Sequence, residues 1–492
     1  MIRRLPLSAS GPLTMNFPRL ASVPLLMQLA SSLIVFFGVG GYYFGDTHGD
    51  LMHTSHFEGG EMIFRNPAFP ALLDLIGHVF PPGGRTTVLF VIHHLLLLLG
   101  VWLLQATMTR LGRPLLGLAA SVLLVLAFRQ TVLAQFIQTE TLFLTLVLLA
   151  ILLLFETRRS IAGDRRQAWF LLLSFGLVAG LAQVTRMVGI AVLVPAALVL
   201  GRELWIKHRW QAVFPLCWVG VGILAANLGG MLYHSQVNGR FLLLEQKGSH
   251  LMNHVAHYHE SLHPSPEARD IEAAAAAIGK PIYQTEIWDL HRQLSEDYGK
   301  DAAKADRVLG KAAKQTMLAD PGKAISDNWE ALATVTQPVR IDWLFTGLGE
   351  GWTDASHATY HQRLNPAQKF TDAWPVDPPA TDSLNPLIAA LGENPVATLS
   401  RGRYVIHTLI ALGLVGLFCW FRDPARCETL IFAGTAAGMV VVAVATEIPL
   451  TRFWEPSAPL FLLALVCAAS DLGNLVLKKL GLRIATAEGG NG

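Results

Sequence analysis

The most regular feature of the chain is the recurrence of long apolar stretches between short polar ones. A helix that crosses a bilayer needs about 20 mostly apolar residues, and ten stretches approach this length. They lie near 21–43, 86–108, 114–129, 138–156, 168–185, 187–201, 211–233, 403–421, 427–446 and 456–476. Those between 114 and 201 are the least distinct, because they are short and closely spaced. The pattern predicts an all-α, polytopic membrane helix bundle of about ten spans.

The polar intervals between these stretches indicate the orientation. With a cytoplasmic N-terminus, the short inner segments carry 17 Lys and Arg residues and the short outer segments carry 5. Cytoplasmic loops are enriched in these residues. The bias therefore predicts a multi-pass protein of the plasma membrane, the inner membrane in a cell that has two, with both termini cytoplasmic. A first outer loop at 44–85 and a long outer segment at 234–402 follow from this orientation.

These intervals divide the chain into an N-terminal membrane module (1–233), an extracytoplasmic domain (234–402) and a C-terminal three-span module (403–492). The outer domain is predicted to be mainly helical. Ser265, Pro266 and Gly279 have the properties of an N-cap, a first helical residue and a helix end. Residues 283–299 and 301–322 resemble two further amphipathic helices. Residues 352–396 are rich in Pro, Asp and Thr, and we expect an ordered loop there.

Composition agrees with a membrane protein, since 52% of the residues are hydrophobic and only 15% are charged. A soluble globular chain is usually about 25% charged. The formal net charge of +2 gives no sign of a nucleic-acid partner. Cys217, Cys419, Cys427 and Cys467 all lie in or beside apolar stretches, so no disulfide framework is expected in the outer domain.

Ionisable residues are concentrated directly after the first apolar stretch, in YYFGDTHGDLMHTSHFEGG. Asp46 follows Gly45 where the first span ends, and a carboxylate there is well placed to take a proton from a substrate hydroxyl. A solvated loop carboxylate is the structural alternative for Asp46, and it is favoured for Asp50. The segment 66–80, NPAFPALLDLIGHVF, is apolar but too short to span, and it resembles helices lying along the membrane surface.

Histidines in two outer segments raise the question of a metal. One set is His48, His53 and His56, beside Asp46 and Asp50, and the other includes His250, His254 and His257 on one helical face. Imidazole and carboxylate together suit several divalent metals. Neither spacing matches a strong metal motif, so ordinary exposed or interfacial histidines are favoured. No cofactor is assigned, and a divalent metal stays an open alternative.

Three further outer motifs carry charge at the membrane boundary. QTETLF contains Glu140, AQVTRMVGIAVLVP contains Arg186, and TRFWEPSAP contains Arg452. Ionisable groups at membrane depth are costly and often mark a functional cavity, and a guanidinium suits phosphate oxygens. The structural alternative for each arginine is that its side chain simply extends to the membrane surface, without a role in binding. All of these motifs fall on the predicted outer side of the membrane. This favours a site in which the arginines bind an anionic lipid headgroup and a carboxylate beside them acts as a base.

In this order, the motifs resemble the GT-C superfamily of polytopic glycosyltransferases. The resemblance is closest to its branch of protein O-mannosyltransferases and lipid A aminoarabinose transferases. It covers about 20–200 and 440–475. The matching positions are Asp46 for the essential acidic residue of the first loop, Pro67 and Pro70, Glu140, Arg186, Gly189, Pro195, Arg452, Pro456 and Pro459. Asp50 stands where the family has a tyrosine, and Phe453 also replaces a tyrosine. Residues 234–402 resemble no known family.

The resemblance implies an inverting transfer of a sugar from a polyprenyl-phosphate donor to an acceptor at the outer face. Asp46 would be the general base, with Asp50 and Glu140 as further catalytic candidates. Arg186 and Arg452 would bind the donor phosphate. The donor sugar is left open, and the acceptor could be a lipid, a polysaccharide or a protein.

Two other classes of protein compete with this hypothesis. A lipid or sugar transporter or flippase would complete a transport cycle without a covalent product. Its usual inverted repeats and midplane helix breaks have no counterpart in the sequence pattern. A non-enzymatic envelope scaffold would retain full function after alanine substitution of Asp46 and Arg186.

Overall fold

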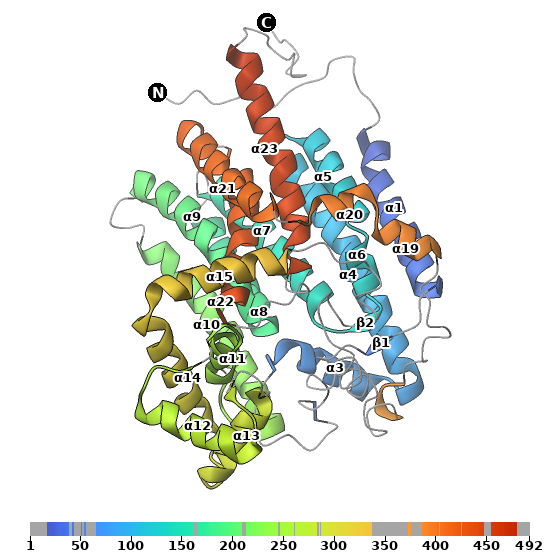
Figure 1. Ribbon diagram of the computed structural model, residues 1–492. Coiled ribbons are helices and arrows are strands. Elements are labelled where there is room, and N and C mark those ends of the chain that lie inside the picture. Colours follow the sequence, from blue (N-terminus) through green and yellow to red (C-terminus); the bar gives the residue numbers. More distant parts are fainter. Residues whose placement is uncertain are drawn as a thin grey trace, which may run out of the picture.

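The computed structural model is helical almost throughout (Figure 1). It describes residues 17–38, 42–43, 51, 54–55, 65–161, 165–208, 213–244, 247–259, 261–282, 285, 287–336, 372–375, 386–402, 404–424, 426–446 and 454–479. Within these ranges the only strands are β1 (Tyr42–Tyr43) and β2 (Phe136–Ile137). The predicted all-α class is therefore confirmed.

Every apolar stretch of the sequence forms a helix in the bundle. These helices are α1 (Phe17–Gly38), α4 (Pro82–Arg110), α5 (Pro114–Leu126), α7 (Glu140–Ser160), α8 (Arg165–Thr185), the 3₁₀ helix η1 (Met187–Val192) with α9 (Leu193–His208), α10 (Val213–Asn238), α21 (Tyr404–Arg422), α22 (Glu428–Thr446) and α23 (Ala458–Lys479). In the described part of the chain, seven helices are long and apolar enough to cross a membrane. Parts of α1, α5 and α22 are shorter apolar segments, so the count of ten spans stays a prediction.

The other described helices belong to the first outer loop, to the segment before β2 and to the insert, which is the predicted extracytoplasmic domain 234–402. The first outer loop contains α3 (Ala68–Val79), and α6 (Arg129–Leu133) precedes β2. The insert contributes α11 (Lys247–Tyr258), α12 (Pro266–Ile278), α13 (Ile287–Asp297), α14 (Ala302–Ala319), α15 (Pro321–Val335), α19 (Pro386–Gly392) and α20 (Pro395–Leu399). In Figure 1, α3 and α11–α14 lie at the bottom, whereas α9, α21 and α23 reach towards the top.

Local sequence signals account for the best-predicted helix of the insert, α12. The Ser265 side chain accepts a hydrogen bond from the backbone N–H of Ala268, and Pro266 is the first helical residue. Gly279 ends the helix with φ of 80°, a left-handed conformation that suits glycine. The ordered loop predicted at 352–396 is wrong where the structure describes it, because α19 and the start of α20 are helical.

Helices α11–α14 share a hydrophobic core of their own, which includes Val255, Ile271, Leu290 and Leu309. Asp306 of α14 fastens α11 to this core, since its carboxylate accepts hydrogen bonds from the backbone N–H groups of Gly248 and Ser249 at 2.9 and 2.8 Å. Gly248 also lies so close to the α14 backbone that a Cβ there would overlap the Asp306 carbonyl group. Helices α11–α14 of the insert are therefore a packed unit with an interior of their own.

A network of ion pairs closes the end of the bundle that is predicted to be cytoplasmic. Arg113, between α4 and α5, lies 3.1 Å from Asp471 of α23 and 3.5 Å from Glu428 of α22. Arg426 reaches Asp471 at 3.3 Å, and Arg158 of α7 pairs with Glu203 of α9 at 3.1 Å. Asp471 and Glu428 are buried, so these arginines supply the charge that makes their ionised forms tolerable. The network joins the two membrane modules.

Small residues allow α8 and α10 to pack at backbone distance. A Cβ added at Gly176 of α8 would overlap the backbone of Val219, and one at Gly222 of α10 would overlap the backbone of Leu173. Membrane helices associate largely through such close van der Waals contact. Gly220, on the same α10 helix, has open space around it.

We predict that Gly176→Ala lowers the stability of the detergent-solubilised protein by about 1–3 kcal/mol, because overpacking forces α8 and α10 apart. The matched variant Gly220→Ala should leave stability unchanged or raise it slightly, since alanine is the better helix former. Thermal unfolding midpoints measure both effects. Equal midpoints for the two variants would contradict the close contact.

Candidate active site

The first outer loop begins beside the connection that leads into α7. Strand β1 pairs in parallel with β2, with Tyr42 opposite Phe136 and Tyr43 opposite Ile137. Parallel strands run in the same direction, so the chain leaves both strands at the same end. Along the sequence, Asp46 comes three residues after Tyr43, and Glu140 comes three residues after Ile137.

Two histidines of α4 contact the connection before β2. His93 Nδ1 lies 3.2 Å from the carbonyl oxygen of Ala134, and His94 Nε2 lies 3.1 Å from Gln135 Nε2. Both imidazoles are buried. A third polar contact comes from α1, where Gln28 Nε2 donates to Thr131 Oγ1 at 3.2 Å. These contacts hold the segment from α6 to β2 against the bundle, and so they position the start of α7.

Glu140 and Arg186 form an ion pair at the end of the bundle. Glu140 is the first residue of α7, where the partial positive charge of the helix N-terminus favours a carboxylate. Its side chain is 6% exposed and that of Arg186 is 15% exposed. The Arg186 guanidinium also lies 6.0 Å from the centre of the Phe143 ring, one turn further along α7. Two sequence candidates from motifs 46 residues apart are thus in direct contact.

The turn that presents Arg186 depends on a glycine. Arg186 is extended, with φ −146° and ψ 132°, between the end of α8 and η1. Its carbonyl oxygen accepts the N–H of Gly189 at 2.8 Å. A side chain at Gly189 would overlap the carbonyl group of Ala182, so only glycine fits this reversal. Behind the turn, α22 brings Gly438 against Ala191 and Gly434 against Pro195.

A second charged group gathers around Glu455, in the turn before α23. The buried Glu455 carboxylate pairs with Arg401 and lies 3.7 Å from Arg129 of α6. Its carbonyl oxygen accepts a hydrogen bond from the side chain of Gln130. The neighbouring Trp454 is fully buried and donates its indole N–H to the carbonyl oxygen of Ser400 at 2.6 Å. The C-terminal module is thereby fixed to α6, close to β2 in sequence.

A small hydrophobic cluster lies beneath the first outer loop. It contains Leu51, Phe69 of α3, Ile137 of β2 and Trp374 of the insert, all fully buried. Leu51 directly follows Asp50 in the sequence. The insert is held here by Arg85, whose guanidinium donates to the carbonyl oxygen of Ala373 at 3.1 Å. Tyr43 and Leu51, the described residues nearest in sequence to Asp46 and Asp50, therefore both lie beside Ile137.

Asp74 of α3 fixes the next part of the loop. Its buried carboxylate accepts hydrogen bonds from the backbone N–H and the hydroxyl of Ser55, each at 2.8 Å. It also accepts the hydroxyl of Tyr233, near the end of α10, at 2.8 Å. Asp74 therefore joins the first loop, the surface helix α3 and the helix that leads into the insert.

Of the five candidate site residues, the structure describes two. Glu140 and Arg186 are brought together, whereas Asp46, Asp50 and Arg452 lie outside the described residues. The sequence motifs did not indicate Asp74, Arg129 or Arg401. For Asp74 there was a signal, because a single carboxylate within an apolar surface helix needs buried partners. The partners of Arg129 and Arg401 follow only from tertiary packing.

The histidine clusters show no metal arrangement where they are described. His48, His53 and His56 lie outside the described residues. In the second cluster, His250 packs edge-on against Trp288, and His257 against Tyr258. His259 Nε2 lies 3.1 Å from Asp327. Among the residues that the structure describes, no three His, Cys, Asp or Glu side chains are grouped as a metal site.

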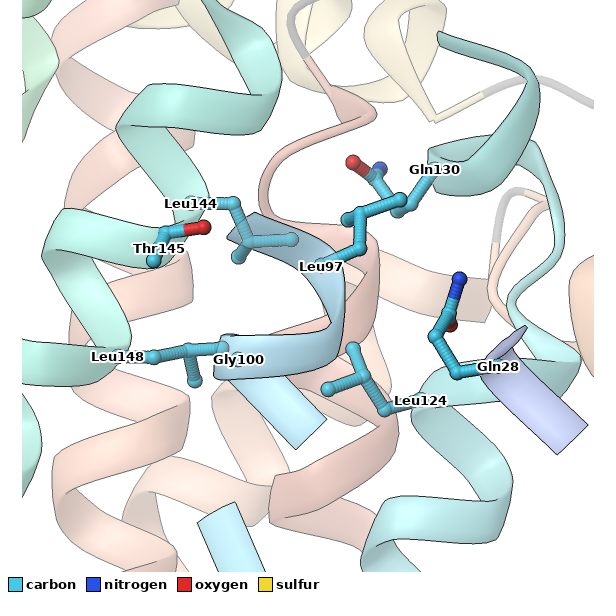
Figure 2. Close-up of a pocket in the computed structure, with 8 residues that line it drawn as sticks. All are labelled: Gln28, Leu97, Gly100, Leu124, Gln130, Leu144, Thr145 and Leu148. Atoms are coloured by element: carbon cyan, nitrogen blue, oxygen red, sulfur yellow. The ribbon is translucent and has the colours of Figure 1, made fainter. Parts of the chain in front are cut away.

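A small cavity lies inside the bundle, between residues of α1, α4, α5, α6 and α7 (Figure 2). Its volume is about 10 Å³, which is room for one water molecule. It is lined by Gln28, Leu97, Gly100, Leu124, Gln130, Leu144, Thr145 and Leu148. A sugar cannot fit in this space, so the cavity is separate from the candidate site, although Gln130 also contacts Glu455.

Comparison with known families supports the sequence motifs. Residues 41–228 match the family model described as dolichyl-phosphate-mannose-protein mannosyltransferase. The matched region holds the first outer loop, β2, Glu140 and Arg186. The resemblance to protein O-mannosyltransferases is thus confirmed over this region. No curated protein matches the sequence.

Two solved structures of the archaeal oligosaccharyltransferase AglB from Archaeoglobus fulgidus align with the chain. The one with an inhibitory peptide and a dolichol-phosphate has 14% identity and a TM-score of 0.44, covering 98% of this chain and 53% of that chain. The other, tethered to an acceptor peptide, has 13% identity and a TM-score of 0.45, covering 97% and 52%. This chain therefore spans about half the length of the archaeal protein.

We predict that Glu140→Gln lowers the stability of the protein by about 3 kcal/mol, because it leaves the Arg186 charge without its partner in a mostly buried position. The double variant Glu140→Gln/Arg186→Gln should lose less than the sum of the two single variants. Thermal unfolding of all four proteins gives this coupling.

The exposed pair Arg110–Glu156 serves as the control for this cycle. Its side chains are 55% and 22% exposed, so its coupling should be below about 1 kcal/mol. A coupling for Glu140–Arg186 no larger than that of the control would show that the buried pair adds nothing.

Proposed function

We propose that the protein is a membrane glycosyltransferase that moves a sugar from a polyprenyl-phosphate donor to an acceptor hydroxyl at the extracytoplasmic face. The observation that carries this proposal is the contact of Glu140 with Arg186 beside the start of the first outer loop. The family match over 41–228 supports the same chemistry. A site at the end of the bundle suits a donor whose prenyl chain stays in the membrane while its sugar reaches the aqueous side.

Asp46 is the proposed general base. Asp46 comes three residues after Tyr43 in the sequence, and Tyr43 pairs with Ile137. Leu51, on the other side of the loop, belongs to the same cluster as Ile137. The described residues on either side of Asp46 and Asp50, Tyr43 and Leu51, thus both lie beside Ile137, three residues before Glu140 in the sequence, and this supports the proposal. Asp50 is the second candidate for the base.

Arg186 and Arg452 are the proposed ligands of the donor phosphate. Arg452 is two residues before Trp454 in the sequence. Trp454 and Glu455 are fixed beside α6, which leads into β2. Positive charge held in a water-poor site stabilises a phosphate whose negative charge grows as its bond to the sugar breaks.

The reaction is a single displacement at the anomeric carbon. The acceptor oxygen forms the new bond on the face opposite the phosphate, and its proton passes to the Asp46 carboxylate. The bond between the anomeric carbon and the phosphate oxygen breaks, and its electron pair leaves with the polyprenyl monophosphate. The configuration at the anomeric carbon is therefore inverted. A divalent metal beside the phosphate is an alternative source of positive charge.

Glu140 acts mainly on Arg186 in this scheme. An ion pair restricts the orientation of the guanidinium, whose N–H groups suit both a carboxylate and a phosphate. Glu140 is thus a positioning residue for the phosphate ligand. These residues do not identify the donor sugar or the acceptor. The ion pair does not indicate which groups would bind the sugar hydroxyls, or which surface would bind the acceptor.

We predict that Asp46→Asn lowers the rate of transfer from a radiolabelled polyprenyl-phosphate sugar by about 10²–10⁴-fold, the usual contribution of a general base. Membranes that contain each variant at equal amounts provide the assay. Asp50→Asn is the matched control and should retain most of the activity. Unchanged transfer by Asp46→Asn together with loss in Asp50→Asn would assign the base to Asp50, and unchanged transfer by both would exclude this mechanism.

We also predict that Arg452→Gln weakens inhibition by polyprenyl monophosphate, the product, by about tenfold or more, since a charged hydrogen bond contributes roughly 1.5–3 kcal/mol. Arg292→Gln is the control, because Arg292 is 70% exposed on α13. The inhibition constant should stay unchanged in this control. An unchanged constant in Arg452→Gln would remove Arg452 from the phosphate site.

A further inference from the structure

Helix α15 presents three different faces. One face packs on the bundle and contains Ala324, Ala331 and Val335, which are buried. A second face carries large apolar side chains that are exposed, with Ile325 72% and Trp329 46% exposed. Leu318, at the end of α14, is a further exposed apolar side chain, 78% exposed, just before the turn at Asp320 that leads into α15.

The third face of α15 is polar and exposed. Lys323, Ser326 and Glu330 are all exposed and follow one another at helical spacing. On a helical projection of 100° per residue, Ser326 and Glu330 lie roughly 100–140° from Ile325. An apolar sector beside a polar one is the pattern of a helix that lies in the interface of a membrane.

The depth of the apolar face is given by its contact with α21. The ring of Trp329 packs edge-on against His407, with ring centres 5.7 Å apart. His407 lies about one turn inside the start of α21, which is one of the candidate membrane spans. Trp329 thus lies beside the first turn of a span. Tryptophan is enriched at this level of a bilayer.

The apolar face of α15 continues into the lipid-facing side of α21. Beyond His407, α21 exposes Ile410, Leu414, Phe418 and Phe421 along one side. Their spacing of three or four residues marks a single helical stripe. In Figure 1, α15 runs across the direction of the spanning helices. The exposed surface therefore follows the stripe of α21 and then turns sideways along α15.

We propose that α15 is a membrane-surface helix whose face of Ile325 and Trp329 inserts, together with the adjoining Leu318 of α14, among the phospholipids of the leaflet next to the candidate site. The polar face with Ser326 and Glu330 points to water. The lipid surface is the occupant because the patch is continuous with a spanning helix, and lipid must already surround that helix. Inserted in this way, α15 sets the height of the α11–α14 unit above the bilayer. The proposal is independent of the proposed transferase activity.

Depth measurement on the full-length protein tests this proposal. Single cysteines replace Ile325 and, separately, Leu318 in a Cys217→Ser background, because Cys217 is exposed whereas Cys419, Cys427 and Cys467 are buried. A nitroxide label is attached to each, and the protein is reconstituted in phosphatidylcholine vesicles. Relaxation of the label by oxygen, which concentrates in lipid, is compared with relaxation by a water-soluble nickel complex.

Ser326→Cys and Glu296→Cys are the controls, the first on the polar face of α15 and the second exposed on α13. We expect oxygen to exceed the nickel complex several-fold at 325 and 318, and the nickel complex to dominate at both controls. Dominance of the nickel complex at 325 and 318 would place the face in water. Poor access for both reagents would place it against another protein surface. Either of these two results overturns the proposal.

Discussion

The parallel pairing of β1 with β2 is the contact on which the arrangement of the candidate site depends. A pair of two-residue strands has little stability by itself. It persists here because Ile137 is buried with Leu51 and Phe69, and because the histidines of α4 hold the preceding connection. Packing of the bundle thus fixes the strand pair, and the strand pair fixes the position at which the first outer loop begins.

The buried charges follow from the same packing. Glu140–Arg186 and Glu455–Arg401 each join segments that are distant in sequence. Neither member of such a pair can be left alone in a dry environment without a large desolvation cost. Each pair therefore restricts how the helices that carry it can be placed. The charged end of the bundle is consequently constrained by contacts between distant parts of the chain.

Sequence patterns predicted the helices well and their contacts poorly. Hydropathy is a property of neighbouring residues, so it located every helix of the bundle, and the capping residues Ser265 and Gly279 located α12. The family motifs placed Glu140 and Arg186 in one site, but their direct pairing required the structure. Asp74, Arg129 and Arg401 acquire their partners through tertiary packing, which leaves no periodic signal. Proline content at 352–396 suggested a loop, although proline also begins α19 and α20.

The carboxylate of Asp74 affects how often the turn at Ser55, in the first loop, can move away from the bundle. Ser55 and Tyr233 both donate to it, so the loop turn and the tip of α10 share one anchor. Swinging this turn outward would break several hydrogen bonds to a charged acceptor at once, and such an event is infrequent compared with thermal side-chain motion. The turn at Ser55 therefore keeps its position over the time of a molecular encounter.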